Sequence, residues 1–451
     1  MILGPIVLLA NIKELFARVV VINLPRRQDR WRQFIRDLPV GWPFGAPLRF
    51  PAIDGAEVEV PVWWREGSGA WGCYLSHCKV LEDCIRDGVE SVLVLEDDAL
   101  FCPKFPLDVR NFLGALPSDW QLLFLGGEHI EIEQGLPVRI NDWVYRPFNA
   151  NRMHAYALRT QAMMERVLTH FRDTDNWIAK HHVDCHLGEL QKKDSTGIYV
   201  PKQWLVYQAE GTSDICHQQL NVRAYMGAED IVNPIVNKPI VAVLSPHGRS
   251  ASLVGGVLHQ LGIHMGNPEG KNIESNGWDF EARNLAHICR NMFEEPWYSE
   301  KLPFEQRVQL LKIWAASHCK TYYHCELLGA MYPTLCLMGP EMINSWNSPF
   351  FICVNESPEE MVLAISRRNP NMPIDACMSI IHQLVSSRNH FLATCSRPAL
   401  QLQSNDLVEN TDECISSICK YLCFEPDIVS SESAFQFVRG RSDRGNDCQI
   451  N

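Results

Sequence analysis

The stretch SVLVLEDDALF, at residues 91–101, constrains the fold and chemistry of this chain more than any other feature. An apolar run meets three adjacent carboxylates, Glu96, Asp97 and Asp98, and then turns apolar again. Like charges at the end of a buried strand repel one another and resist the loss of water. A divalent metal would compensate them, because a hard cation prefers carboxylate oxygens. A solvated turn after a strand is the alternative that this stretch alone leaves open.

The order of strands and helices predicts an α/β sheet in the first half of the chain. Residues 18–24 and 91–95 are short continuous apolar runs, as buried parallel strands are. We expect helices over 26–37 and 75–87 and a further strand over 120–127. Functional loops of such sheets lie at the carboxyl ends of the strands, where the acidic triplet falls.

A second strand–helix start divides the chain. At 451 residues, two or three domains are expected. Regular periodicity fades over 218–238, and a new apolar strand, IVAVLS, begins at residue 240. We therefore place the boundary near residue 230 and predict domains over 1–230 and 236–451.

Composition argues against several classes of protein, although it does not exclude a nucleic-acid acceptor. A net charge of -12 gives no electrostatic footprint for nucleic acid. The chain has no run of about 18 apolar residues, so we expect no transmembrane helix. We interpret the apolar N-terminus as a lead-in to the first strand, since it lacks the basic region of a signal peptide. The 17 cysteines form no CxxC pair, which favours reduced thiols and a cytoplasmic location.

Six blocks of the first half together resemble glycosyltransferase family 25, which includes lipooligosaccharide and collagen galactosyltransferases. In chain order they are VINLPRRQDRWRQF, FPAIDG, GAWGCYLSHCKVLEDCI, VLVLEDDALF, HAYALRTQAM and VDCHL, followed by EGTSDI. The resemblance spans about residues 18–217. It implies a GT-A-like nucleotide-sugar-binding domain in which a D-x-D-like motif holds Mn²⁺ or Mg²⁺ against the donor diphosphate. It also implies an inverting transferase.

The acidic triplet suits this chemistry on physical grounds. Glycosyl transfer expels a nucleoside diphosphate, whose developing charge must be neutralised in the transition state. Glu96 and Asp98, at i and i+2 of an extended segment, project to the same side and are the expected metal ligands. Asp97 would meet the ribose or the water shell of the metal. The pattern does not decide which two of the three bind the ion.

Other donor-site positions follow from the resemblance. The first strand and its loop match the family's nucleotide-binding segment, with a solvated basic helix face as the alternative. The residues concerned are Asn23, Arg26, Arg27 and Arg30. Ser76 and His77 lie in the GC-x-x-SH block and would contact the donor, unless they form a helix-packing hydrogen bond.

An inverting transferase also needs a general base for the acceptor hydroxyl. Asp184 matches the family's late aspartate and is the first candidate, and Asp214 is the second. Three histidines are candidate third metal ligands, although each alone is more often structural or solvent-facing: His182, His186 and His217.

The second half opens on IVAVLSPHGRSASLVGGVLHQLGIHMG, which resembles the strand, loop and helix of P-loop sulfotransferases. Backbone amides of such a loop and the helix N-terminus bind an anion. The resemblance implies that Arg249, Ser250 and Ser252 hold the 5′-phosphosulfate of PAPS. A Ser-capped helix without a ligand is the alternative. The chain has no GxxxxGK[ST], so this is not an ordinary ATPase loop.

A later segment, 349–370, resembles the sulfotransferase element that binds the 3′-phosphate of PAPS. Asn355 stands where the family has arginine, whereas Ser366 and Arg368 remain. The block LMGPEM, at 337–342, lacks the usual lysine. Because charge-assisted bonds are the strong ones, we predict a P-loop sulfotransferase-like α/β domain that has degenerated or changed its ligand.

We therefore predict a metal-dependent inverting glycosyltransferase that moves a hexose from a nucleotide sugar to an acceptor hydroxyl. We expect the nucleotide of the donor to be UDP. The second domain would be a sulfotransferase-like accessory domain that holds PAPS or another anion. One alternative is a bifunctional glycosyltransferase and PAPS-dependent sulfotransferase. The other is a non-catalytic glycan- or nucleotide-binding protein. The sequence does not identify the acceptor, and a nucleic-acid acceptor is not favoured.

Overall fold

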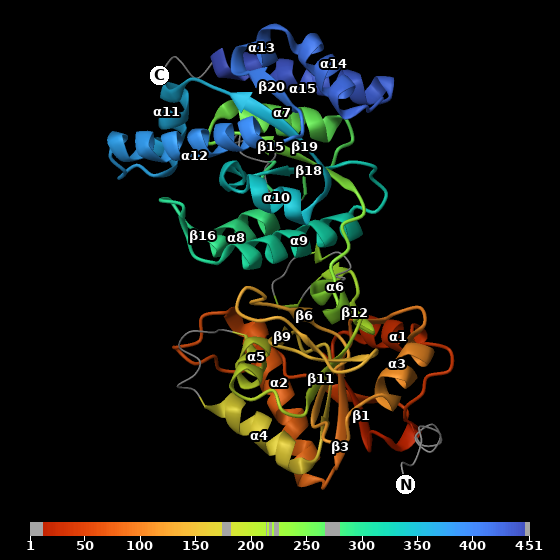
Figure 1. The fold of residues 1–451 in the computed structure, drawn as a ribbon. Helices are drawn as coiled ribbons and strands as arrows, with labels where there is room; N and C mark the ends of the chain where they lie inside the picture. Colours follow the sequence, from red (N-terminus) through yellow and green to blue (C-terminus); the bar gives the residue numbers. More distant parts are fainter. Residues whose placement is uncertain are drawn as a thin grey trace. The chain divides into compact units, whose positions relative to one another are not determined.

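The computed structural model of the protein describes residues 12–173, 182–212, 214–215, 219–220, 225–266 and 280–446. The chain forms two compact units, Met1–Asn233 and Pro234–Asn451. Each unit combines helices with its own main sheet (Figure 1), so the predicted α/β class is confirmed.

The first unit is built on an eight-stranded mixed sheet with the strand order β2-β1-β3-β10-β5-β11-β8-β7. Its strands are β1 Arg18–Asn23, β2 Leu48–Pro51, β3 Ser91–Glu96, β5 Leu122–Phe124, β7 Val138–Arg139, β8 Val144–Arg146, β10 Ala155–Arg159 and β11 Ile198–Pro201. Two-stranded ladders pair β4 Ala99–Phe101 with β12 Val206–Gln208, β6 Glu128–His129 with β9 Ala150–Asn151, and β13 Gly211–Thr212 with β14 Gln219–Leu220. The helices are α1 Gln28–Arg36, α2 Gly67–Arg86, α3 Phe105–Gly114, α4 Gln161–Arg172, α5 Val183–Lys193 and α6 Ala228–Val232, with 3₁₀ turns at Ile12–Glu14 and Gly55–Glu57.

Side chains of the central strands alternate between two apolar cores, one on each face of this sheet. Val94 points to the core shared with α2, α4 and α5, and Leu95 points to the core shared with α1 and α3. Figure 1 shows these two groups of helices on opposite sides of the strands. Because both faces are covered, the inner positions of these strands are apolar. Asn23 of β1 and Glu96 of β3 are the polar residues at the carboxyl ends of the two strands.

Two features of this unit differ from the sequence-based expectation. Helix α2 begins at Gly67 rather than near residue 75, because its first turns carry small residues that pack closely on another segment. A Cβ atom at Gly72 would lie 2.6 Å from the backbone nitrogen of Gly55. Strand β10 is antiparallel and lies between β3 and β5. The sheet is therefore mixed and is not a simple series of parallel crossovers.

His129 of β6 is half-buried, and both of its ring nitrogens are shielded from solvent. His129 stacks on Trp204 with ring centroids 4.8 Å apart. Both of its ring nitrogens are buried without a hydrogen-bond partner among the described residues, and burial lowers the pKa of His129 to about 3.

We expect this histidine to destabilise the fold as the pH falls. The unfolded chain protonates His129 below a pKa of about 6.5, whereas the folded chain resists protonation down to about 3. Stability is therefore lost as the pH drops below about 6.5, by roughly 2 kcal/mol at pH 5. The variant His129→Phe should show a smaller decrease in unfolding temperature between pH 7.5 and pH 5 than the parent chain. An equal decrease in both proteins would contradict this prediction, and the exposed His287→Phe is the matched control.

The second unit is built on a parallel four-stranded sheet with the order β18-β15-β19-β20. The strands are β15 Pro239–Leu244, β18 Leu328–Met331, β19 Asn347–Asn355 and β20 Ala399–Gln403, with a separate ladder of β16 Phe293–Glu294 and β17 Ser299–Glu300. The helices are α7 Arg249–Gln260, α8 Arg283–Met292, α9 Phe304–Thr321, α10 Gly339–Ser345, α11 Pro358–Arg368, α12 Ile374–Thr394, α13 Ser404–Glu409, α14 Thr411–Leu422 and α15 Ile428–Asn446, with a 3₁₀ turn at Pro333–Leu337. An apolar core joins β15 and β19 to α7, α13, α14 and α15.

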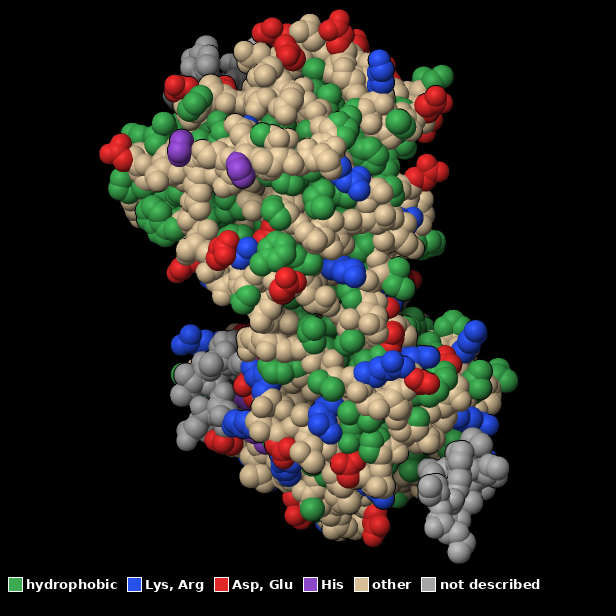
Figure 2. All heavy atoms as spheres, viewed as in Figure 1, with side chains coloured by type: hydrophobic (Ala, Val, Ile, Leu, Met, Phe, Trp, Pro, Cys, Tyr) green, Lys and Arg blue, Asp and Glu red, His purple; other side chains and the backbone are tan. Residues whose placement is uncertain are grey.

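Two further features concern the described helices and the surface charge. None of these helices combines the length and the apolar character needed to cross a bilayer. On the face drawn in Figure 2, basic and acidic side chains are interspersed, and no continuous basic stripe appears.

Candidate functional site

The two central strands of the first unit end next to each other, and a basic segment meets the acidic triplet there. In the parallel register of β1 and β3, Ile22 is opposite Glu96. The next residues, Asn23 and Asp97, are in contact: Asn23 Nδ2 donates to Asp97 Oδ2 at 2.5 Å. Arg30 Nη1 of α1 lies 3.1 Å from Asp97 Oδ1. Asp97 is therefore engaged by an amide and a guanidinium.

Glu96 meets a buried histidine of α2. His77 is fully buried, and its Nε2 lies 3.2 Å from Glu96 Oε1. Its Nδ1 lies 3.2 Å from the hydroxyl oxygen of Tyr156, on β10. Burial acts to raise the pKa of Glu96, but the hydrogen bond and charge of His77, with a further contribution from His154, outweigh it and lower the pKa. Glu96 is held ionised, and its partner His77 was one of the predicted site residues.

Asp98 is the member of the triplet that has a buried carboxylate oxygen, Oδ1, without a hydrogen-bond partner among the described residues. Burial, followed by the charges of Glu96 and Asp97, raises the pKa of Asp98 to about 8. A buried polar atom without a partner requires an explanation, and a divalent cation bound to carboxylate oxygens would supply one. The residues present therefore fit a metal at Glu96 and Asp98.

The charge of Asp184 acts on a thiol that Glu96 and Asp98 also affect. It is in the first turn of α5, and its Oδ1 accepts a hydrogen bond from the backbone N–H of Cys185 at 2.9 Å. Burial raises the pKa of the Cys73 thiol, and the charges of Glu96, Asp184 and Asp98 add to the effect. The charges of all three carboxylates therefore disfavour the thiolate of Cys73.

The histidines proposed as third metal ligands are engaged elsewhere or lie outside the described residues. His182 Nε2 is 3.2 Å from Glu66 Oε2. His186 is fully buried, and its ring packs beside that of His170, with ring centroids 6.2 Å apart. His217 falls outside the described residues.

Asp214, the second candidate base, is enclosed by ion pairs. Arg26 Nη1 lies 2.7 Å from its carboxylate, and Arg27 contacts the other oxygen. Burial opposes ionisation, but these arginines outweigh it and lower the pKa of Asp214. Arg26 also pairs with Asp54 at 2.7 Å. The predicted nucleotide-binding arginines thus neutralise carboxylates of this chain, and Asp214 is a weak candidate for accepting a proton.

Ser76 has a structural role. It is 1% exposed, its Oγ donates to the carbonyl of Gly72 at 2.6 Å, and it accepts from the backbone N–H of Ile53 at 2.9 Å. The bond from Ile53 fastens the loop after β2 to α2, and the bond to Gly72 lies within the helix. The structure thus favours the helix-packing interpretation of Ser76 over direct contact with a donor.

Sequence reasoning missed Cys73, which precedes His77 by one helical turn. Its Sγ lies in a cluster with His77 and Glu96. The i, i+4 spacing of Cys73 and His77 was the signal that could have found it, because such residues share a helix face.

In the second unit, the loop between β15 and α7 holds a carboxylate of this chain. Ser250 and Ser252 are buried. Ser250 Oγ donates to Glu356 Oε1 at 3.1 Å. A Cβ atom at Gly248 would lie 1.6 Å from Glu356 Oε2, so this glycine is required for the approach of the carboxylate. The side chain of Arg249 is outside the described part of the structure.

Residues of the predicted 3′-phosphate element are engaged within the protein. Asn355 Nδ2 donates to Gln401 at 3.1 Å, and Asn355 Oδ1 accepts from Arg388 Nη2 at 2.9 Å. Arg388 of α12 is 4% exposed and also donates to the carbonyl of Val354. Ser366 Oγ donates to the carbonyl of Leu363 within α11. Sequence reasoning missed Arg388, a buried guanidinium of a distant helix that contacts Asn355.

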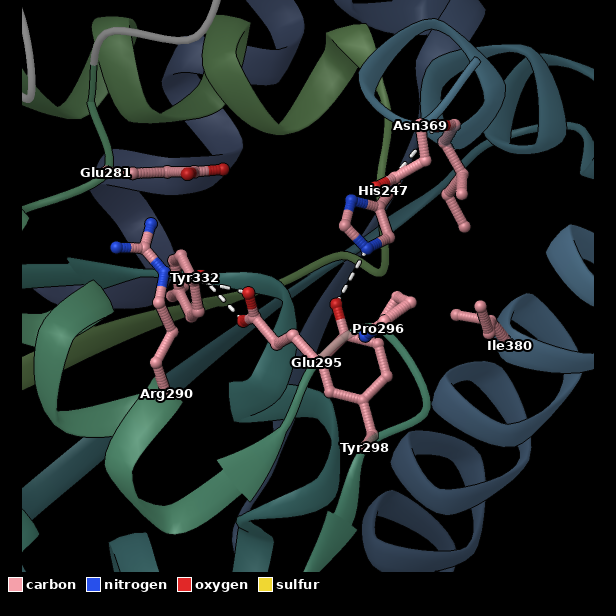
Figure 3. A pocket seen from close by; sticks show the side chains of 10 residues that line it. His247, Glu281, Arg290, Glu295, Pro296, Tyr298, Tyr332, Asn369 and Ile380 are labelled. Carbon is pink, nitrogen blue, oxygen red and sulfur yellow. Dashed lines mark hydrogen bonds and ion pairs between the residues drawn. The ribbon is translucent and has the colours of Figure 1, made fainter. Parts of the chain in front are cut away.

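A cavity of about 460 Å³ lies beside this loop (Figure 3). His247 Nε2 lies 2.9 Å from the hydroxyl of Tyr298, and the Tyr332 hydroxyl donates to Glu295 at 2.7 Å. Figure 3 shows Arg290 and Glu281 on the same side of the cavity. His247 and Glu281 also line the space at the 245–252 loop, so the loop and cavity adjoin.

We predict that Glu356 competes with anions for the loop. Adenosine 3′,5′-bisphosphate should bind the full chain weakly and no better than adenosine 5′-phosphate. The variant Glu356→Gln should bind the 5′-phosphate roughly tenfold more tightly, because a like charge is removed from the site. Calorimetric titration would measure both ligands, with Glu359→Gln on the exposed start of α11 as the matched control. A strong preference of the parent chain for the bisphosphate would contradict this account and restore a PAPS site.

Comparison with known proteins gives the class of the first unit. Residues 67–169 match the model of glycosyltransferase family 25, described as an LPS biosynthesis protein. This range contains the GC-x-x-SH block and the acidic triplet, so the similarity to glycosyltransferase family 25 covers the candidate site of the first unit.

Particular relatives share only part of the chain. Procollagen galactosyltransferase 1 of Danio rerio is 28% identical over 137 residues, which cover 26% of this chain and 23% of the relative. Inactive glycosyltransferase 25 family member 3 of Homo sapiens is 28% identical over 145 residues, which cover 27% and 24%. The matched region therefore spans about a quarter of the length of these curated relatives.

Two sulfotransferase structures are among the solved structures that are similar to this chain, at low TM-scores. The sulfotransferase domain of the Synechococcus olefin synthase has a TM-score of 0.30 and 16% identity, covering 44% of this chain and 78% of that chain. A sulfotransferase from Mycobacterium avium has a TM-score of 0.35 and 6% identity, covering 47% and 70%.

Proposed function

We propose that the first unit is a metal-dependent inverting glycosyltransferase that moves a hexose from a UDP-linked donor to an acceptor hydroxyl. The family 25 match supports the class of reaction. One observation supports the placement of the reaction at the acidic triplet. The buried Oδ1 of Asp98 has no hydrogen-bond partner among the described residues, and two further carboxylates, Glu96 and Asp97, precede it in the chain.

Glu96 and Asp98 would hold Mn²⁺ or Mg²⁺, because Asp97 is engaged by Asn23 and Arg30. When bound, the cation supplies charge neutralisation for the departing diphosphate. Asn23 and Arg30 fix Asp97 on the basic side of the site, where the nucleotide would lie. His77 keeps Glu96 ionised and oriented.

Asp184 would accept the proton of the acceptor hydroxyl as its oxygen attacks the sugar carbon in line with the leaving diphosphate. Its place at the start of α5, near Glu96 and Asp98, supports this role. Asp214 is less suited, because Arg26 and Arg27 stabilise its charged form and lower its pKa.

The second unit would serve as an accessory domain and would not carry out sulfate transfer. Glu356 supplies a negative charge where a sulfotransferase loop would bind an anionic cofactor. The competing candidate for the whole protein is a non-catalytic binding protein, because one matched relative is named inactive.

The test is a hydrolysis screen of nucleotide sugars with the full chain, in Mn²⁺ and in excess EDTA. It requires no knowledge of the acceptor. Turnover of one donor class that depends on Mn²⁺ is the expected result. Absence of turnover for every donor, with retained nucleotide binding, would instead support the non-catalytic candidate.

A further inference from the structure

We propose that Cys73, His77 and Glu96 form a three-ligand site for a borderline transition metal of the Zn²⁺ or Co²⁺ type. The thiol, a ring nitrogen and a carboxylate oxygen of these residues lie within 4.8 Å of one another. Neither the family match nor the acidic triplet assigns a role to the thiol.

The scaffold presents these three groups from rigid elements. Cys73 and His77 are four residues apart on α2 and share one face of the helix. Glu96 is the last residue of β3. Close packing of Gly72 on Gly55 holds the start of α2 in place.

The histidine is oriented as a ligating histidine usually is. A metal-bound imidazole commonly uses its second nitrogen for a hydrogen bond that fixes the ring. His77 Nδ1 lies 3.2 Å from the Tyr156 hydroxyl, which leaves Nε2 directed to Glu96 at 3.2 Å. His77 is also fully buried, so the ring cannot turn towards solvent.

The spacing is close to that of a bound ion. Metal–ligand distances of about 2.0–2.3 Å in a tetrahedron place the ligand atoms roughly 3.3–3.8 Å apart. The ligand atoms of the three residues lie within 4.8 Å of one another, so they would have to approach by about an ångström to bind one ion. Side-chain rotations can supply this movement. Three protein ligands leave one position open, as in catalytic zinc sites. Binding would release the thiol proton to water, while neutral His77 would bind through Nε2 and keep its proton on Nδ1.

This inference deepens the proposed function, because Glu96 is shared with the Glu96 and Asp98 pair that would bind a hard cation. A thiolate selects softer metals than carboxylates do. Participation of Cys73 would therefore make Zn²⁺ or Co²⁺ the preferred ion, over Mg²⁺. The structure assigns Cys73 to no disulfide, so its thiol is available for this role.

The test is a Co²⁺ titration of the full chain followed by absorption spectroscopy, with equilibrium dialysis to count bound ions. We expect one equivalent to produce a thiolate-to-cobalt charge-transfer band in the near ultraviolet. Cys73→Ser should abolish this band and weaken Co²⁺ binding at least about tenfold, the smallest loss expected even for an outer-shell partner. Cys102→Ser, outside the cluster, should leave both unchanged.

Each other outcome overturns the inference. Co²⁺ binding without the charge-transfer band, or a band that survives in Cys73→Ser, would show that the thiol is not a ligand. If Co²⁺ binds without the band and Asp98→Asn abolishes this binding, the result would support the Glu96 and Asp98 metal site of the proposed function. If dialysis detects no bound Co²⁺ and no bound Mn²⁺, both the inference and the metal dependence of the proposed function fail.

Discussion

Replacing Asp98 with asparagine should lower metal-dependent donor turnover by at least about 10²-fold, comparable to the loss of one electrostatic stabiliser of a transition state. The amide keeps the shape of the side chain but removes the charge that would bind the cation. The buried Oδ1 of Asp98 has no partner among the described residues, so the substitution breaks no hydrogen bond there. Thermal unfolding of Asp98→Asn should match or exceed that of the parent chain, because burial and two neighbouring carboxylates disfavour the charge.

The measurement is the initial rate of donor hydrolysis in Mn²⁺. Glu90→Gln is the matched control, because Glu90 is an exposed acid that immediately precedes β3, at the end far from the triplet. Full donor hydrolysis by the parent chain in excess EDTA would show that no divalent cation takes part.

The second large effect concerns the base. Asp184→Asn should lower transfer to the acceptor by about 10²-fold or more, the usual contribution of general-base catalysis, while donor affinity stays nearly constant. The reason is that the carboxylate would act on the acceptor hydroxyl alone. Rates of transfer and calorimetric titration of the donor give the two quantities separately.

Asp194→Asn, at the other end of α5, is the control for a change in helix charge. If donor binding collapses in Asp184→Asn, this carboxylate belongs to the metal or nucleotide site. Asp214 would then be the next residue to test, although the arginines that surround it make it a weaker base.

Strands buried on both faces were the most predictable elements. β1, β3 and β15 are apolar at successive positions, which the expected strands at 18–24, 91–95 and 240 reflect. The early start of α2 was less predictable, because GSGAWGCY has no apolar stripe, and its helical form depends on close packing with the segment near Gly55. Local patterns carry little information about such tertiary contacts.

The candidate site also has a part that the sequence predicts and a part that it does not. Three adjacent carboxylates after an apolar strand are visible in the sequence, because burying like charges is costly. The contacts of Glu356 with Ser250 and of Arg388 with Leu244 join residues 106 and 144 positions apart. No local spacing predicts contacts between residues so far apart in the chain. The sequence therefore showed that cations expected of a sulfotransferase are absent, but it did not show the contacts that Glu356 and Arg388 make in the folded unit.

The most direct test of the central claim is a calorimetric titration of the full chain with the donor that the hydrolysis screen selects. We predict binding in Mn²⁺ that weakens at least roughly tenfold after EDTA, with Asp98→Asn in Mn²⁺ behaving like the parent chain in EDTA. Equal donor affinity in all three conditions would contradict the assignment of the acidic triplet as the metal and donor site.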